Sequence, residues 1–413
     1  MQLHPILASL RHHKLTSLLL MLQVTLTCAI VCNVASLIAT RIGNISLATG
    51  IQEPGLSSLY VTDVNHGGDP LAQHTADLAA LRALPGVRSA AAVDNSLPLG
   101  QSGFSSTTCD SKSDADHAHQ LHTSKARGCG QAGIYAGGPG EIATLGVRLV
   151  EGRDFQPGEY VTRGPDGPAA VPAAILSRSL AEHLFPGQDA LGKDIYVGQK
   201  VIRVVGITDT VLADHLDEPA SDCWTMFWPI LPTRADVLYL LRSDPKDQAQ
   251  LLKQAHETLL RINPERILRE ERSYTELRHA YFQRDYTMIG LLLASALGLL
   301  LVTAIGIAGL AGFWVQQRTR QIGIRRAIGA TRRDVLRHFQ AENLLIVGAG
   351  IVLGLGLAVA LNMLLVREYG VAPLPYAYPL LTAMLLLAVG QVAVLNPALH
   401  ASRIPPATAT RNL

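Results

Sequence analysis

The chain has 413 residues, of which 48% are hydrophobic and 16% charged, and its formal net charge at pH 7 is +2. Soluble domains carry about 25% charged residues, whereas the mean hydropathy of this chain is positive, at +0.22. This composition argues against a wholly soluble protein and predicts a membrane protein with a sizeable polar portion.

Four segments are long and apolar enough to cross a bilayer as helices. A spanning helix needs about 20 apolar residues, because the bilayer core holds no water to satisfy backbone groups. Residues 18–39, 288–315, 344–366 and 379–395 meet this requirement. The first segment is too long for a signal peptide and lacks a small-residue cleavage site, so we interpret it as a retained anchor.

Arginines and lysines near these spans predict which side of the membrane each connection faces, because they stay preferentially on the cytoplasmic side. Arg11 and Lys14 precede the first span. Arginines also fill the link between the second and third spans and follow the fourth: Arg318, Arg320, Arg325, Arg326, Arg332, Arg333 and Arg337, then Arg403 and Arg411. We therefore expect cytoplasmic segments at 1–17, 316–343 and 396–413, and outer segments at 40–287 and 367–378.

The long outer segment reads as a folded α+β domain. Near its start "SSLYVTDV", "HTADLAALRAL" and "VRSAAAV" predict a strand, a helix and a strand, and near its end "DVLYLLRS", "AQLLKQAHETLLRI" and "ERILRE" repeat that order. Two such units around an insertion predict a split ferredoxin-like lobe, with a second lobe inserted at about 99–228. The fold class is thus a four-span α-helical membrane protein with a large α+β domain between spans one and two.

Residues 107–130 of the inserted lobe read as a loose polar loop. Cys109 and Cys129 could form a disulfide there in an oxidising compartment, although Cys223 could take either partner. Such a bridge would contribute about 3 kcal/mol in the chain-entropy model. The loop also holds residue types that bind metals, namely Asp114, Asp116, His117, His119 and His122. Their spacing matches no fixed metal framework, so we expect a solvated loop and no metal.

Small residues in two spans predict close helix packing. Gly350, Gly354 and Ala358 recur every four residues in the third span, and the second span carries Gly306, Gly309 and Gly312. No charged residue lies in the middle of any span, which argues against a proton relay. The sequence also lacks the phosphate-loop, nucleophile-elbow and H-E-x-x-H motifs, so we expect no catalytic residues and no enzyme.

The stretch "RTRQIGIRRAIGATRRDV" predicts a helix, a break and a second helix between spans two and three. "GA" breaks the helical pattern, and Thr331 with Asp334 resembles a capping box. The arginines are explained by topology and anionic lipid alone. The apolar residues among them are not, and they suggest a surface that fits a partner: Ile322, Ile324, Ile328, Val335 and Phe339.

This stretch, continued as "LRHFQAENLLI", closely resembles the signature of MacB and FtsX-type permeases of ABC transporters. "LGVRLVEGRDFQPGE", "LAEHLFPGQDALGKDIYVG" and "NPALHASRIPPATATR" resemble further parts of that family. The resemblance implies a dimer, of two copies or of two related permeases, with the second span extended as a stalk. It also implies a cytoplasmic ATPase that binds ATP and Mg²⁺, whereas no cofactor is expected in this chain.

The resemblance further implies a coupling element that docks on the ATPase, made of Ile322, Gly323, Ile324, Arg325, Arg326, Ala327, Ile328 and Gly329. The isoleucines would sit in a groove of the ATPase, and the two arginines would pair with its acidic residues. The MacB protein carries a fused ATPase ahead of its first span, whereas only residues 1–17 precede the span here. We therefore expect the ATPase as a separate polypeptide.

The leading functional hypothesis is the permease of an exporter of peptides, antibiotics or similar amphiphiles in a bacterial inner membrane. Its termini would be cytoplasmic, and a periplasmic adaptor and an outer-membrane channel are possible partners besides lipid, whereas nucleic acid is not expected. Two alternatives stay open. One is a lipoprotein-release permease of the Lol type, and the other is a non-transporting transmitter, like FtsX, that activates cell-wall hydrolases.

Overall fold

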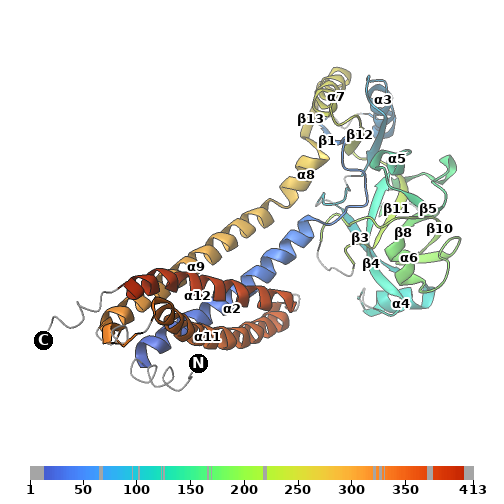
Figure 1. Cartoon of the computed structure of the whole chain (residues 1–413). Coiled ribbons are helices and arrows are strands. Elements are labelled where there is room, and N and C mark those ends of the chain that lie inside the picture. Colours follow the sequence, from blue (N-terminus) through green and yellow to red (C-terminus); the bar gives the residue numbers. More distant parts are fainter. Residues whose placement is uncertain are drawn as a thin grey trace. The chain divides into compact units, whose positions relative to one another are not determined.

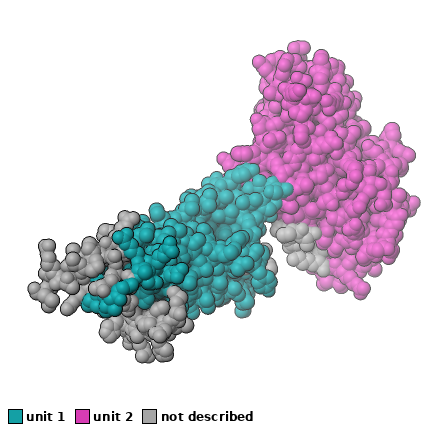
Figure 2. All heavy atoms as spheres, in the orientation of Figure 1, with its two compact units in different colours: residues 1–46, 284–413 teal, residues 47–283 magenta. Residues whose placement is uncertain are grey.

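The chain folds as two compact units. The computed structural model describes residues 14–64, 68–94, 96–100, 103–121, 123, 126–164, 167–168, 170–216, 221–319, 322–324, 328–329, 331–369 and 375–403. Unit 1 takes residues 1–46 and 284–413, and unit 2 takes residues 47–283, as the two colours of Figure 2 show.

Unit 1 contains four long helices: α2 (Lys14–Ile45), α9 (Gln283–Gln317), α11 (Arg332–Tyr369) and α12 (Ala377–Arg403). Each holds a stretch long and apolar enough to cross a membrane, with mean hydropathies between 2.0 and 2.7. The helices extend beyond the predicted spans, because the polar residues that flank each apolar stretch also form helical backbone hydrogen bonds. The predicted link 316–343 is consequently mostly helical, since α11 already begins at Arg332.

Helices α2 and α11 pack closely through small residues (Figure 1). A Cβ atom added to Gly354 would lie 2.5 Å from Cβ of Cys28, and one added to Gly350 would lie 2.9 Å from Cβ of Val24. Ala358 is fully buried in a cluster with Cys32. The row Gly350, Gly354 and Ala358 therefore faces α2, as small residues at a close helix contact do.

The glycines of α9 behave differently, because two of them have no close neighbour among the described residues of this chain. Gly306 has Oε1 of Gln23 2.6 Å from its added Cβ position, but Gly309 and Gly312 have no described atom within 4 Å of theirs. The buried face of α9 is formed instead by Thr303, Ile307, Ala311 and Trp314. Residues three or four apart share a helix face, so this face turns Gly309 and Gly312 outward.

Unit 2 contains the split ferredoxin-like lobe. Its elements are β1 (Leu56–Asp63), α3 (Pro70–Arg82), β2 (Ser89–Val93), β12 (Asp236–Arg242), α7 (Gln248–Ile262) and β13 (Arg266–Ser273). The strands pair antiparallel in the order β13-β1-β12-β2, which is the ferredoxin-like order. Helices α3 and α7 cover one face of this sheet, where Leu81, Tyr239 and Leu259 belong to one apolar cluster (Figure 1).

A buried charged network connects the two sequence halves of this lobe. Arg266 of β13 pairs through Nε with Oδ1 of Asp63 at 3.1 Å and through Nη1 with Oδ1 of Asp77 at 2.9 Å. The exposed fractions of these three side chains are 0%, 7% and 1%. Tyr239 of β12 donates to the other oxygen of Asp77 at 2.7 Å. Burial and then the Asp77 charge raise the pKa of Tyr239, so its hydroxyl stays a donor.

The inserted segment continues the same sheet. Its elements are β3 (Phe104–Cys109), α4 (Lys112–Leu121), β4 (Cys129–Gly137), α5 (Glu141–Leu145), β5 (Leu149–Gly152), the 3₁₀ turn η1 (Pro157–Glu159), β6 (Val161–Gly164), β7 (Gly167–Pro168), β8 (Ala173–Ser177), α6 (Arg178–Leu184), β9 (Asp194–Val197), β10 (Lys200–Thr208) and β11 (Thr225–Leu231). Strand β4 joins the two lobes, because Val93 of β2 pairs with Gly137. Helix α8 (Tyr274–Tyr281) follows β13.

An apolar cluster bridges the two lobes, in addition to a cluster within each lobe. Leu56 and Leu240 of the ferredoxin-like sheet cluster with Leu145 of α5 and with Tyr135 and Phe227 of the insertion. All five side chains are buried. This packing between the lobes makes unit 2 one compact unit.

The prediction of a loose polar loop at 107–130 is wrong. This segment forms the end of β3, helix α4 and the start of β4, and Cys109 pairs with Cys129 across the β3–β4 ladder. The two cysteines form a disulfide. The polar residues of α4 misled the prediction, because only Ala115 and Ala118 of this helix are buried. His122, one of the metal-binding residue types noted above, lies outside the described residues.

Candidate coupling site

The turn between α9 and α11, residues 318–331, is built from local signals. Residues 322–324 are helical, and Gly329 has a φ angle of +105°, a backbone conformation that side chains with a Cβ rarely adopt. Thr331 then caps α11. Its amide and its hydroxyl both donate to Oδ2 of Asp334, at 3.0 and 2.6 Å, and its hydroxyl accepts from the Asp334 amide at 3.2 Å. These reciprocal bonds form the expected capping box.

The isoleucines of this turn point in two directions. Ile324 and Ile328 are 47% and 82% exposed, respectively, whereas Ile322 is only 6% exposed. Ile322 belongs to the apolar cluster of the helices, together with Val335 and Phe339 of α11. The expectation that Ile322, Val335 and Phe339 offer a surface to a partner is therefore wrong, because their own helices already bury them.

The remaining predicted coupling residues are only partly described. Gly323 lies within the helical residues 322–324, next to the buried Ile322. Arg325, Arg326 and Ala327 lie outside the described residues. The described part of the site therefore consists of a buried isoleucine, the glycine beside it, two exposed isoleucines and Gly329.

An ion pair that sequence reasoning missed joins this turn to α11. Nη1 of Arg318 lies 3.1 and 3.0 Å from the two carboxylate oxygens of Glu342. The side chains are 14% and 3% exposed, so the pair is shielded from water. The available signal was a single acidic residue, Glu342, at the start of an otherwise apolar span that follows an arginine-rich stretch.

Helix α9 is held to α2 by separate polar contacts along its length. The hydroxyls of Thr27 and Thr303 lie 2.8 Å apart, and the amide nitrogen of Gln23 donates to the carbonyl oxygen of Val302 at 3.2 Å. At the other end of α9, Arg41 forms an ion pair with Asp285. Much of the rest of α9 is exposed, including Leu291, Leu297, Leu301, Ile305 and Phe313.

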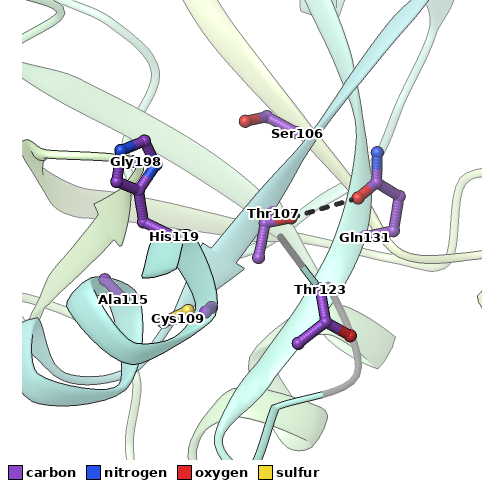
Figure 3. Close-up of a pocket in the computed structure, with 9 residues that line it drawn as sticks. Ser106, Thr107, Cys109, Ala115, His119, Thr123, Gln131 and Gly198 are labelled. Atoms are coloured by element: carbon purple, nitrogen blue, oxygen red, sulfur yellow. Dashed lines mark hydrogen bonds between the residues drawn. The ribbon is translucent and has the colours of Figure 1, made fainter. Parts of the chain in front are cut away.

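A pocket of about 420 Å³ lies on unit 2, beside the Cys109–Cys129 disulfide. Figure 3 shows His119 of α4, Thr107 of β3 and Gln131 of β4 around it, with the Thr107 hydroxyl donating to the Gln131 side chain at 3.3 Å. Within the part of the chain that the structure describes, no group of three or more His, Cys, Asp or Glu residues is arranged to hold a metal ion.

Comparison with known families places both ends of the chain in one group of proteins. Residues 15–257 match the family described as "MacB-like periplasmic core domain", and residues 293–406 match the "FtsX-like permease C-terminal" family. The first match covers more than half of the chain and includes the first span. The second covers most of α9 together with α11 and α12.

Curated relatives agree with these matches. The chain is 25% identical over 252 residues to a macrolide export ATP-binding/permease protein MacB of Shewanella sp., covering 57% of this chain and 37% of that protein. It is 28% identical over 275 residues to the MacB protein of Nitrobacter winogradskyi, covering 64% and 42%. The pyoverdine export ATP-binding/permease protein PvdT of Pseudomonas fluorescens is 25% identical over 258 residues, covering 61% and 39%.

The chain thus spans well under half of the length of these relatives. The two matched families, a periplasmic core domain and a permease C-terminal region, belong to the permease component of ABC transporters, which is not itself the catalytic component. With a family match over more than half of its length, four candidate spans and a mixed α/β domain after the first, this chain belongs to the MacB/FtsX-type permeases of ABC transporters.

Proposed function

We propose that this chain is the permease subunit of an ABC exporter, in which an ATPase docks at the turn between α9 and α11 and moves the periplasmic domain. The observation that carries this proposal is the exposure of Ile324 and Ile328, at 47% and 82%, in a polar turn between two apolar helices. Apolar side chains in such a position favour burial against a partner, because their exposure to water costs free energy.

The geometry supports a division of work among the three isoleucines. Ile322 anchors the turn in the apolar cluster of the helices, and Ile324 and Ile328 are the groups that enter the ATPase. Arg325 and Arg326, which lie outside the described residues, would pair with acidic residues at the rim of that groove. ATP and Mg²⁺ would be bound by the ATPase and not by this chain.

The names of the relatives support a proposal on the substrate class. Their names include the export of macrolides and the export of pyoverdine, and these are different molecules. We propose that this chain likewise acts in the export of an amphiphile, with a second copy or a related permease, a periplasmic adaptor and an outer-membrane channel. Lipoprotein release and activation of a cell-wall hydrolase are the competing functions, and they require a lipoprotein carrier or a hydrolase instead of the adaptor.

The experiment is affinity purification of the tagged full chain from bacterial membranes in mild detergent, followed by an ATP hydrolysis assay and mass spectrometry of the eluate. Ile324→Glu and Ile328→Glu should each remove the co-purifying ATPase activity while leaving the amount of membrane-inserted chain unchanged. Ile262→Glu is the matched control, because Ile262 is 44% exposed and lies in unit 2. ATPase activity that persists in both variants, or that resides in the chain itself, would refute the proposal.

A further inference from the structure

The Arg318–Glu342 pair reaches a different helix from the polar contacts of α9 described above. The contacts made by Asp285, Val302 and Thr303 all go to α2, whereas Arg318 reaches α11. It does so from the first residue after α9, at the point where the turn begins. The pair therefore connects the two helices that the turn joins, directly beside the proposed docking residues.

The backbone on both sides of Arg318 keeps its helical hydrogen bonds. The Arg318 amide donates to the carbonyl oxygen of Trp314 at 3.1 Å, and the Ile322 amide donates to the carbonyl oxygen of Arg318 at 2.9 Å. Helical bonding thus runs from α9 through Arg318 to Ile322. A displacement of the turn is passed along this backbone, provided that Arg318 itself is held in place.

The ion pair with Glu342 holds the Arg318 side chain in place. One guanidinium nitrogen contacts both oxygens of a carboxylate that is almost fully buried, which restricts the arginine in distance and in direction. A buried ion pair is a poor way to gain stability, because apolar side chains of similar volume stabilise as well or better. The burial of this pair, next to residues such as Ile322 and Phe339 whose apolar packing already holds the helices, therefore favours a role in geometry.

We infer that Arg318 and Glu342 are positioning residues that make the turn, the end of α9 and the start of α11 move as one body. A displacement imposed on Ile324 and Ile328 then reaches α9 instead of bending the chain at residue 318. This inference rests on the proposed function, because it assumes that the turn is where the ATPase acts. Ion-pair networks and rigid secondary elements are means by which coupling between distant sites is carried.

The test places spin labels at exposed positions of the full chain in lipid nanodiscs with the ATPase. Cysteines at Arg333, Leu297 and Met384, which are all exposed, report the start of α11 beside the turn, α9 and α12. Ile328 stays unmodified because it is a proposed docking residue. The free cysteines Cys28, Cys32 and Cys223 are replaced by alanine. Electron–electron distances from residue 384 to each of the other two labels are measured without nucleotide and with ATP trapped.

The variants remove the pair in graded steps. Glu342→Gln removes one charge at nearly constant volume, and Arg318→Lys keeps the charge but loses the planar guanidinium. Asp194→Asn is the matched control, because it removes the exposed Arg203–Asp194 pair of unit 2 by the same carboxylate-to-amide change. Only the monodisperse fraction from size exclusion is labelled, so that unfolded chain does not contribute.

In the chain with an unmodified Arg318–Glu342 pair, trapped ATP should change both distances measured from residue 384. In Glu342→Gln the shift at residue 333 should remain and the shift at residue 297 should be lost, with a partial loss in Arg318→Lys and none in Asp194→Asn. The double variant Arg318→Glu with Glu342→Arg should recover part of the shift at residue 297, which a role in stability alone would not produce. A full shift at residue 297 in Glu342→Gln would overturn the inference.

A second measurement separates this inference from the proposed function. Without any ATPase, Glu342→Gln should widen the distribution of distances between residues 297 and 384 relative to Asp194→Asn. If no ATPase associates with the unmodified chain, the proposed function fails, and this width still decides whether the pair holds α9. An unchanged width, with docking intact, would show that the pair does not position the helix.

Discussion

Replacing Glu141 by glutamine tests how burial of a carboxyl group controls the stability of the periplasmic domain. Glu141 begins α5 and is 3% exposed, and its Oε1 has no hydrogen-bond partner among the described residues. Its other oxygen would lie 2.6 Å from a Cβ added to Gly137. Burial, with a smaller contribution from the Asp154 charge, raises the pKa of Glu141 from 4.5 to about 8.

The sign of the effect follows from proton linkage. The folded domain keeps the Glu141 proton up to about pH 8, whereas the unfolded chain releases it near pH 4.5. The unfolded state therefore binds fewer protons across this window, and the free energy of unfolding falls as pH rises through it. One pKa unit corresponds to about 1.4 kcal/mol, so the loss attributable to this group between pH 5.5 and 7.5 is about 3 kcal/mol.

The assay is urea unfolding of the full chain in detergent, followed by the fluorescence of Trp224 and Trp228, which both lie in unit 2. Trp314→Phe removes the signal of the helices. Glu141→Gln should flatten the decrease in the free energy of unfolding between pH 5.5 and 7.5 and raise the urea midpoint at pH 7.5. An equally steep decrease in the variant would refute the reasoning, because another group would then be responsible.

Three further predictions concern packing and covalent links. Gly354→Ala should lower the melting temperature of the detergent-solubilised chain, because overpacking the contact with α2 costs about 1–3 kcal/mol of stability. Gly309→Ala should leave the melting temperature unchanged, because its position is open. Arg266→Met should destabilise unit 2 by about 3–5 kcal/mol in urea unfolding, because it leaves two buried aspartates unpaired. Cys109→Ala should lower the free energy of unfolding of the same unit by about 3 kcal/mol, which is the chain-entropy contribution of a disulfide that closes a loop of this size. Equal urea midpoints of the unmodified chain with and without a reductant would contradict this expectation.

Much of the architecture could be predicted because its signals are local. The apolar runs in α2, α9, α11 and α12 exceed the length needed to span a bilayer whatever their neighbours are. The strand-helix-strand units of the ferredoxin-like lobe follow from alternation and helical periodicity within short windows. The Thr331 capping box depends on a spacing of three residues, so it was visible in the sequence.

The errors fall where contacts between distant residues decide. The sequence predicts a loop at α4, because this helix has no extended apolar face. Its two alanines are buried by the neighbouring strands and the disulfide. The Arg266 network joins residues about two hundred positions apart, so no window along the sequence contains it. Gly309 and Gly312 carry the same small-residue signal as Gly350, and only the rotation of α9 about its axis separates them.

The candidate site also has features that the sequence predicts and features that only the fold determines. The sequence by itself determined that a charged turn with interleaved isoleucines links two spans, because composition and helical period are properties of the chain. Only the tertiary structure decided that Ile322 is buried while Ile328 is exposed, and that Arg318 meets Glu342 across 24 residues. Burial and charge pairing depend on how helices pack against one another, and that packing is fixed by the whole fold.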